Sequence, residues 1–216
     1  MASTVEGCPA RTYSNAEFGN EKVVSVHRMK LVFSCLRLIP HMALVMSLRN
    51  DDLFMFDIIR WSEIYFSTAP HSRWEFLKSF AWFMTFRPEF RNIFYLRHQS
   101  KTKLFRWLCP SLSTLEIASP NIGPGLFIQH GLSTLISAER IGANCWVNQQ
   151  VTIGYGNGKC PSIGDNVRIH AGAKLIGGVK IGNNVTVGLN TVVLNDLPSD
   201  ISVLGVPARR ILRGSP

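Results

Sequence analysis

Residues 163–193 have the sequence IGDNVRIHAGAKLIGGVKIGNNVTVGLNTVV, in which an aliphatic residue recurs at every sixth position. The series consists of Ile163, Ile169, Leu175, Ile181, Val187 and Val193. A small or aliphatic residue lies two positions before most members, and residues i−2 and i project from the same face of a strand. A period of six fits neither a single helix nor a flat sheet. It predicts short strands stacked as a parallel β-helix with glycines at tight corners, and disfavours a sandwich of short strands.

The same period extends upstream with two irregularities. With Thr134 included there are twelve units, and three units per turn give four coils: 122/128/134, 141/147/153, 163/169/175 and 181/187/193. One irregularity is the seven-residue step from Thr134 to Ile141. The other is the ten-residue step from Ile153 to Ile163, where residues 155–161 are expected to form a loop that projects from one corner.

Stacking the coils places outward residues in columns. One column contains the residue two positions after the second unit of each coil: His130, Gln149, Ala171 and Leu189. The neighbouring column contains the residue one position after that unit: Gln129, Asn148, His170 and Gly188. Successive members of a column should lie about 4.8 Å apart, the spacing of hydrogen-bonded strands. A histidine therefore begins an outward track that becomes small and apolar, which suits a narrow thioester-bearing arm.

Residues 1–110 read as a tail followed by helices. Residues 1–20 are polar and are expected to form a flexible tail. The apolar run over residues 31–48 contains Arg37, Pro40 and His41, so two helices broken near Pro40 are favoured over a membrane span. Peripheral contact with an anionic membrane surface stays open, through the basic residues Arg28, Lys30, Arg37 and Arg49.

Three further segments complete the helical part. A helix is expected over residues 51–67 with an aspartate cap, and another from Pro88 to about Trp107. Between them, residues 72–86 are rich in Trp and Phe, which favours core or subunit contacts over a cofactor site. The predicted fold class is α+β, with a helical domain over residues 21–110 and a β-helix domain with a C-terminal tail over residues 111–216.

The amino-acid composition restricts the possible binding partners and the cellular compartment. The 216 residues include 23 Lys/Arg and 14 Asp/Glu, a net charge of +9. Residues 1–110 hold 15 basic and 9 acidic side chains (+6), and the rest hold 8 and 5 (+3). Without a nucleic-acid motif, the charge suggests a membrane surface, a phosphorylated cofactor or an acidic glycan. Five cysteines without a CxxC pair, and no secretory signal, indicate a reducing, cytoplasmic location.

Four segments carry a resemblance to a known family: 128–131 (IQHG), 148–154 (NQQVTIG), 169–174 (IHAGAK) and 205–209 (GVPAR). Together they resemble the serine acetyltransferase branch of the left-handed β-helix acyltransferases, over about residues 115–214. Residues 56–61 and 88–92 are also similar to serine-acetyltransferase-like enzymes of polysaccharide gene clusters. The left-handed coil is implied by this resemblance, because the period does not determine the hand.

The resemblance implies transfer of an acetyl group from acetyl-CoA to a hydroxyl. His130 matches the catalytic histidine, and an imidazole can accept the hydroxyl proton near neutral pH. The family also has a carboxylate that orients this histidine, and the nearest candidate is Glu116, one residue out of register. The turn at Gly154–Gly156 is the candidate oxyanion donor. Each residue also has an alternative without a catalytic role. His130 could only form a hydrogen bond across a corner, and Glu116 could be a solvated glutamate at the entrance to the first coil.

The resemblance also implies a set of CoA contacts. Ala171, Gly172 and Leu189 match positions along the column, and Tyr155 and Gly156 match the turn near the thioester arm. Arg209 matches a C-terminal arginine, and Arg210 adds charge for phosphates, unless both belong to a solvated basic tail. Similar enzymes are homotrimers or dimers of trimers with sites between neighbouring β-helices. No metal is expected, since only His130 and His170 lie in the repeats and a metal hydratase of similar fold would need three histidines.

One departure bears on the acceptor. Serine acetyltransferases have a second histidine in an Arg-His-Pro segment before the third coil, where this chain has Lys159-Cys160-Pro161. Cys160 is interpreted as a structural thiol rather than an acyl-carrying nucleophile. The expected function is therefore O-acetylation of a sugar hydroxyl on a surface polysaccharide or its precursor. The alternatives are serine O-acetylation in cysteine synthesis and a non-catalytic scaffold.

Overall fold

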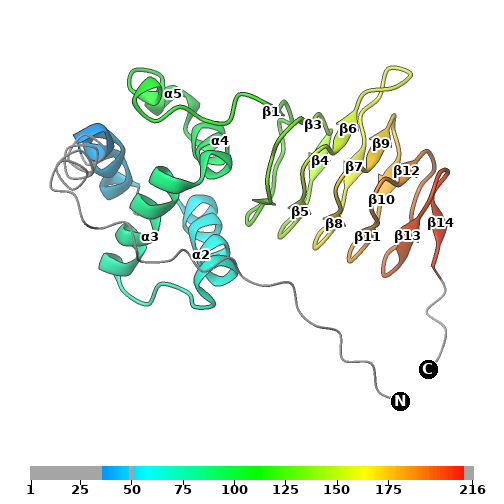
Figure 1. Ribbon diagram of the computed structural model, residues 1–216, viewed down its shortest axis with the longest axis horizontal. Coiled ribbons are helices and arrows are strands. Elements are labelled where there is room, and N and C mark those ends of the chain that lie inside the picture. The colour runs from blue at the N-terminus through cyan, green and yellow to red at the C-terminus, as the bar shows by residue number, and fades with distance from the viewer. Residues whose placement is uncertain (1–35, 49–50, 212–216) are drawn as a thin grey trace, which may run out of the picture. The chain divides into compact units, whose positions relative to one another are not determined.

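The computed structural model describes residues 36–48 and 51–211, so the predicted tail and the basic residues Arg28, Lys30 and Arg49 lie outside it. From Leu38 onward the chain forms one compact unit in which helices precede strands (Figure 1). The division into domains at residues 110 and 111 stays a prediction. Within the described ranges, no helix is long and apolar enough to cross a membrane.

The first described helix covers residues 36–47 and continues through Pro40. The predicted break at this proline is therefore wrong. A proline removes one backbone hydrogen bond from a helix, and here the helix is held by burial on both sides of it. Leu38, His41 and Val45 are all buried, and His41 Nε2 lies 2.9 Å from the hydroxyl of Tyr95.

Helices α2 (Asp52–Phe66), α3 (Arg73–Phe86) and α4 (Pro88–Arg97) make up most of the remaining helical part. The Asp51 carboxylate caps α2 by accepting the Phe54 N–H, and the Ser72 hydroxyl caps α3 by accepting the Glu75 N–H. The aromatic segment packs as core: Phe76, Phe80 and Phe83 are buried. Its first tryptophan, Trp74, is 65% exposed.

The helix predicted from Pro88 to Trp107 ends early. Helix α4 stops at Arg97, and the short helices α5 (Gln99–Thr102) and η1 (Arg106–Leu108) follow. The interruption falls at His98, whose φ of −124° and ψ of 39° are not helical. Its ring is buried with Nδ1 3.7 Å from Asp51 Oδ2, so a tertiary contact replaces helix continuation.

Three parallel sheets wrap the β-helix. Sheet A contains β1 (Leu115–Ile117), β3 (Thr134–Ile136), β6 (Thr152–Gly154), β9 (Lys174–Ile176) and β12 (Val192–Val193). Sheet B contains β4 (Arg140–Ile141), β7 (Ser162–Ile163) and β10 (Lys180–Ile181). Sheet C contains β2 (Phe127–Ile128), β5 (Trp146–Val147), β8 (Arg168–Ile169), β11 (Thr186–Val187), β13 (Ser202–Leu204) and the antiparallel β14 (Arg209–Arg210).

The predicted helices followed by a parallel β-helix are confirmed, but the coil count was slightly low. Four complete turns are flanked by β1 at one end and by a partial turn at the other, about five turns in all. The partial turn runs from Leu197, which pairs with Ile181, to β13. The aliphatic series stacks in register, as shown by the pairs Val147–Ile169 and Ile169–Val187.

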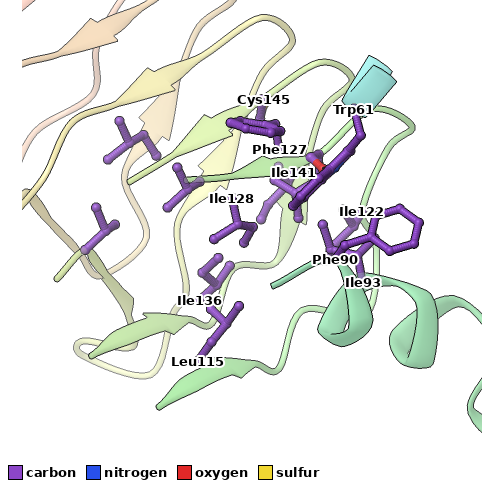
Figure 2. Packing of buried hydrophobic residues seen from close by; sticks show 14 of the residues in the cluster. Trp61, Phe90, Ile93, Leu115, Ile122, Phe127, Ile128, Ile136, Ile141 and Cys145 are labelled. Carbon is purple, nitrogen blue, oxygen red and sulfur yellow. The ribbon is translucent and has the colours of Figure 1, made fainter. Parts of the chain in front are cut away.

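The core of the β-helix continues into the helices. Figure 2 shows Trp61, Phe90 and Ile93 beside first-turn residues such as Phe127, and the Trp61 and Phe127 ring centroids are 4.6 Å apart. The Trp61 indole N–H also donates to the Leu126 carbonyl at 2.9 Å. Helices α2 and α4 therefore cover the first turn and fix its position relative to the helical part.

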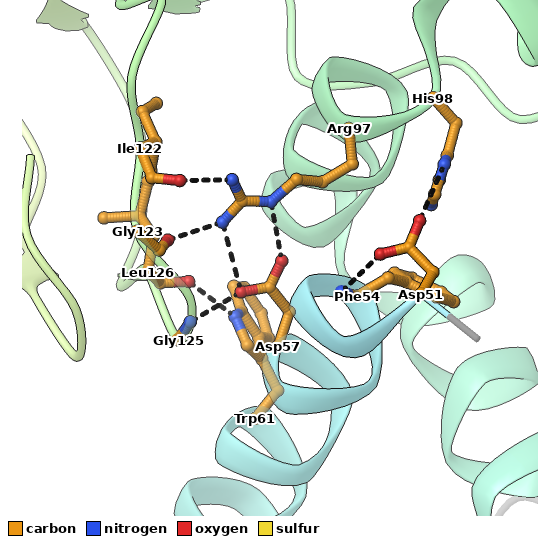
Figure 3. A network of polar contacts seen from close by, with 10 residues as sticks. All are labelled: Asp51, Phe54, Asp57, Trp61, Arg97, His98, Ile122, Gly123, Gly125 and Leu126. Carbon is orange, nitrogen blue, oxygen red and sulfur yellow. Dashed lines mark hydrogen bonds and ion pairs between the residues drawn. The ribbon is translucent and has the colours of Figure 1, made fainter.

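Polar contacts reinforce this junction (Figure 3). Arg97 Nε donates to Asp57 Oδ2 at 3.0 Å, and the other guanidinium nitrogens donate to the Ile122 and Gly123 carbonyls. The Asp57 carboxylate accepts the Gly125 N–H at 2.7 Å. Burial raises the pKa of Asp57, and Arg97 opposes that shift. One ion pair thus joins α2, α4 and the segment before β2.

Candidate active site

His130 lies in the corner between β2 and β3, residues 129–133, called here the His130 corner. Sheet C aligns Ile128 with Val147, and sheet A aligns Ile136 with Ile153. Eight positions therefore separate the two core residues of the first turn, against six in the second. The His130 corner is longer than the equivalent corner of the next turn by two residues.

Backbone hydrogen bonds locate the two extra residues. In the regular turns, the Gly172 N–H donates to the Gln149 carbonyl and the Asn190 N–H donates to the Ala171 carbonyl. The Gln150 N–H instead donates to the carbonyl of Leu132. Leu132 therefore takes the place of Gln149 and Ala171 in the ladder, and His130 and Gly131 form the insertion.

The predicted column thus needs a correction. It holds Leu132, Gln149, Ala171 and Leu189, while His130 projects from a bulge beside it. The predicted unit at Thr134 is also out of phase, because Ile136 is the core residue aligned with Ile153. Thr134 misled the count because it is buried two positions before Ile136, on the same face of the strand and next to Leu115.

The bulge has an unusual backbone. His130 has a φ of 54° and Ser133 a φ of 50°, so this corner contains two left-handed residues. The equivalent corners contain one each, at Gln150, Gly172 and Asn190. Left-handed conformations are uncommon for residues other than glycine and asparagine. The conformation leaves His130 exposed, with its side chain free to contact a substrate.

Glu116 lies on the outer face of sheet A, next to this corner. It is the central residue of β1 and pairs with Leu135 of β3. Its side chain is exposed. Within residues 51–211, no hydrogen bond or ion pair joins Glu116 to His130, so the structure brings the two into one neighbourhood without direct contact.

A polar cluster borders the corner on sheet C. The Trp146 indole N–H donates to Asn148 Oδ1 at 2.8 Å and to Gln129 Oε1 at 3.2 Å. The Arg168 guanidinium lies 5.7 Å from the Trp146 ring centroid. Trp146 was missed as a site neighbour, although its place on the outer face of β5 follows from the repeat. Gln149 Oε1, one position further, is buried without a described partner.

The predicted loop projects from the carboxyl ends of the sheet A strands, whereas the His130 corner lies at their amino ends. It follows β6, and Figure 1 shows it extending beyond the coil between β6 and β7. Gly156 and Lys159 pair across it, and Tyr155 at its base is 68% exposed. A Cβ on Gly156 would lie 3.0 Å from Ile176 Cγ2. In one chain, a full strand of sheet A separates this turn from His130.

The other predicted CoA residues lie at the end of sheet C and in the corners that lead from sheet C to sheet A, called here the C–A corners. Ala171 and Gly172 are half-buried and Leu189 is 61% exposed. Gly172 has a φ of 76°, and a Cβ there would clash with Asn190 Oδ1. Arg209 and Arg210 are exposed on β14, where Arg210 borders a polar groove with Thr186 and Ser202.

The thiols and possible metal ligands do not form a further centre. Cys160 is half-buried with Sγ 3.7 Å from the Ser137 hydroxyl. Burial raises the pKa of the Cys145 thiol to about 11, which disfavours the reactive thiolate. In the part of the chain that the structure describes, no three His, Cys, Asp or Glu side chains are grouped as metal ligands.

The hexapeptide repeat agrees with comparisons to known proteins. Residues 160–195 match the family model described as bacterial transferase hexapeptide (six repeats). A serine acetyltransferase of Synechococcus elongatus is 41% identical over 118 residues, which cover 51% of this chain and 48% of the relative. One of Staphylococcus xylosus is 49% identical over 92 residues, 40% of this chain and 42% of the relative. The chain spans about half the length of these relatives.

Solved structures give the same result for the fold. The soybean serine acetyltransferase complexed with serine has a TM-score of 0.55 and 27% identity, covering 72% of this chain and 67% of that one. The Neisseria gonorrhoeae serine acetyltransferase in complex with serine has a TM-score of 0.56, covering 80% and 74%. At 22% identity the latter likeness concerns the fold alone.

The chain therefore carries the repeat of the hexapeptide transferases. Within that class, its relatives named above are serine acetyltransferases. The expectation of a polysaccharide acceptor is wrong, because these relatives favour the alternative, serine. The segments that suggested a polysaccharide enzyme have a packing role: Ile58, Trp61 and Phe90 are buried, and Asp57 binds Arg97. Residues 56–61 and 88–92 therefore hold the helices against the β-helix, and their sequence does not indicate the acceptor.

Proposed function

We propose that this chain transfers an acetyl group from acetyl-CoA to the hydroxyl of serine. One observation carries the proposal: an exposed histidine bulges from the first turn of a hexapeptide β-helix whose sequence relatives are serine acetyltransferases. Its transferase activity, acceptor and assembly are all parts of this proposal.

His130 would act as the general base. Its imidazole takes the hydroxyl proton while the serine oxygen attacks the thioester carbonyl. A C–O bond forms, the C–S bond breaks, and the imidazolium returns the proton to the departing thiolate. General-base help of this kind contributes roughly 10²–10⁴ in rate. Glu116, on the adjacent strand, is the predicted orienting carboxylate.

The outer surface of the C–A corners fits a narrow acyl-carrying arm. Ala171 and Gly172 present no long side chain there, and a Cβ on Gly172 would clash with Asn190 Oδ1. Leu189 adds an exposed apolar contact, and Arg209 and Arg210 supply positive charge for phosphates. These residues would hold acetyl-CoA, and no bound metal is needed for the transfer.

Tyr155 and Gly156 enter the same site only through assembly. They lie across sheet A from His130 of their own chain, so a neighbouring β-helix would have to supply them. A homotrimer, or a dimer of trimers, would satisfy this requirement by cyclic symmetry. The Gly154–Gly156 turn of one chain would then offer backbone N–H groups to the oxyanion near His130 of the next chain.

The serine site must differ from that of the enzymes resembled. Cys160 stands where their Arg-His-Pro segment has its second histidine, so serine has to be held by other groups. The proposal is tested by incubating the purified protein with acetyl-CoA and L-serine. Thiol release and O-acetylserine formation are both measured. D-serine, threonine and glycerol are the acceptor controls. We expect L-serine to be preferred and His130→Ala to lose at least about 100-fold in kcat.

Two results would overturn the proposal. If His130→Ala retained full transfer, the β-helix would be a scaffold or would use another base. If the wild-type protein released thiol with glycerol but formed no O-acetylserine, the acceptor would be wrong while the chemistry stood.

A further inference from the structure

The helical part of the chain reaches the His130 corner. A Cβ placed on Gly131 would lie 3.4 Å from Glu89 Cγ and 2.9 Å from Leu115 Cδ2. Gly131 directly follows His130, so Glu89 packs against the inserted pair itself. This acidic residue belongs to the first turn of α4, more than 40 positions away from His130 in the sequence.

The position of Glu89 is held by its own helix. Asn92, three residues later and on the same face of α4, donates to the carbonyls of Leu112 and Leu115 at 3.1 and 3.0 Å. The Leu112 N–H donates back to Asn92 Oδ1 at 2.9 Å. This face of α4 is thus fastened to β1 and to the segment that leads into it.

The distance between Glu89 and His130 does not exceed the combined reach of their side chains. Consecutive Cα atoms are about 3.8 Å apart, so Glu89 Cγ lies within roughly 9 Å of the His130 Cα atom. A carboxyl group and an imidazole extending from these atoms span such a distance. Glu89 and His130 make no described hydrogen bond within residues 51–211, but catalytic hydrogen bonds often tighten only when substrate binds.

Burial distinguishes Glu89 from Glu116. Glu89 is half-buried at the junction of α4 and the corner, whereas Glu116 is exposed on sheet A. A partly buried carboxylate interacts more strongly with a neighbouring imidazolium, because less water screens it. Glu89 also affects Tyr65 of α2: burial raises the pKa of this phenol, Arg87 opposes the shift and Glu89 adds to it.

We propose that Glu89 is a positioning residue for His130. Its carboxylate accepts a hydrogen bond from one imidazole N–H, holds the neutral tautomer with the other nitrogen toward the acceptor hydroxyl, and stabilises the imidazolium formed during transfer. The inference rests on the proposed function of His130. It gives the helical part of the chain a place in the active site.

Other charged groups lie on the elements packed around the corner. Arg87 lies over the Tyr65 ring at 4.3 Å and two positions before Glu89, Glu116 comes from β1, and Lys174 donates to the Gln150 carbonyl. The plain alternative is that Glu89 only stabilises the start of α4, as acidic residues do at helix N-termini. Glu75 provides the matched control, since it lies in the first turn of α3 and accepts the His71 N–H.

The experiment measures kcat and kcat/KM for acetyl transfer to L-serine from pH 5.5 to 9. It compares wild type with Glu89→Gln, Glu89→Asp, Glu116→Gln, Glu75→Gln and His130→Ala. An orienting carboxylate contributes part of the general-base gain, so Glu89→Gln should lower kcat about 10- to 100-fold. Its kcat/KM profile should have its acidic limb at lower pH, because the imidazolium loses a stabilising charge. Glu89→Asp should recover part of the rate, and Glu75→Gln should match wild type.

The outcomes separate the two proposals. If His130→Ala is inactive but Glu89→Gln keeps the wild-type rate and pH profile, the inference fails and the proposed function stands. If Glu116→Gln alone moves the acidic limb, Glu116 is the positioning residue. A kcat loss in Glu89→Gln without the pH shift, or an equal loss in Glu75→Gln, assigns Glu89 a helix-stabilising role. If His130→Ala is fully active, the proposed function itself fails.

Discussion

Arg97 Nε lies 3.0 Å from Asp57 Oδ2, and the carboxylate of this pair is fully buried between α2, α4 and the first turn of the β-helix. The guanidinium also binds two backbone carbonyls, and the carboxylate binds one backbone N–H. Each charge therefore has several partners in a largely buried site. The position of α4, and so of Glu89, depends on this pair.

Removing the carboxylate should strongly destabilise the protein. Asp57→Ala leaves the Arg97 charge buried without its counter-ion, and breaking such a pair typically costs about 3–5 kcal/mol. Urea unfolding followed by circular dichroism would measure the change. Glu63→Ala is the control, because its 3.7 Å pair with Arg60 is partly exposed and should contribute less than about 1 kcal/mol. Similar small losses in both variants would contradict the structural role of Asp57.

His98 should make the protein less stable in mild acid. Burial lowers the pKa of His98, and the Asp51 carboxylate opposes this only in part. The unfolded chain, with an ordinary histidine pKa near 6.5, then takes up a proton before the folded chain does. The free energy of unfolding should fall as the pH drops below about 6.5, until the folded histidine titrates as well.

The stability difference between wild type and His98→Gln isolates this effect. Denaturant unfolding at a series of pH values from 5 to 8 should show a difference that changes as the pH falls below about 6.5 and is constant above it. His71→Gln is the matched control, because His71 is exposed. A difference that stays constant with pH for His98→Gln would show that burial does not suppress its protonation.

Tight stacking at one corner should make Gly142 irreplaceable. A Cβ there would lie 2.5 Å from both the carbonyl carbon and the oxygen of Gly164, which are backbone atoms of the next turn. At Gly154 the nearest atoms would be 3.4 and 3.5 Å away, an ordinary contact. Gly142→Ala should cost about 1–3 kcal/mol or more, whereas Gly154→Ala should change thermal stability little. Equal melting temperatures for the two variants would refute the comparison.

Active sites shared between chains should be restored by mixing two inactive variants. One variant is His130→Ala, and the other is a Tyr155→Ala/Gly156→Val double variant. Co-expressed with different tags in equal amounts, they should regain about a quarter of wild-type activity, since one interface in four pairs an intact histidine with an intact loop. Each variant alone is the control. Mixtures as inactive as their components would place the whole site within one chain.

The periodic part of the sequence predicted the fold well, for a physical reason. Ile163 to Val193 repeat because each inward side chain must fill the same narrow core, so sequence and structure share one period. The insertion at His130 and Gly131 escaped detection because Thr134 is buried at the sixth place, while the true core residue is Ile136. The insertion could have been detected from the spacing of the isoleucines, which is eight positions from Ile128 to Ile136 and five from Ile136 to Ile141.

Tertiary contacts explain the remaining errors. Pro40 stays helical because Leu38 and His41 on either side of it are buried, and α4 ends at His98 because that ring contacts Asp51. Glu89 shows no periodic relation to His130, so only the docking of α4 onto β1 brings it to the corner. The acceptor was mistaken because Asp57 and Trp61 are packing residues, whose presence constrains the helix junction and leaves substrate choice undetermined.

The antiparallel strand β14 has a consequence beyond the placement of its two arginines. A stack of parallel strands exposes unpaired backbone groups at its ends, and another molecule could add to them and build a fibre. At one end α2 and α4 lie over the first turn, and at the other β14 turns back along β13. A parallel strand of a second molecule therefore cannot pair with β13, so in-register stacking on this end of sheet C is prevented.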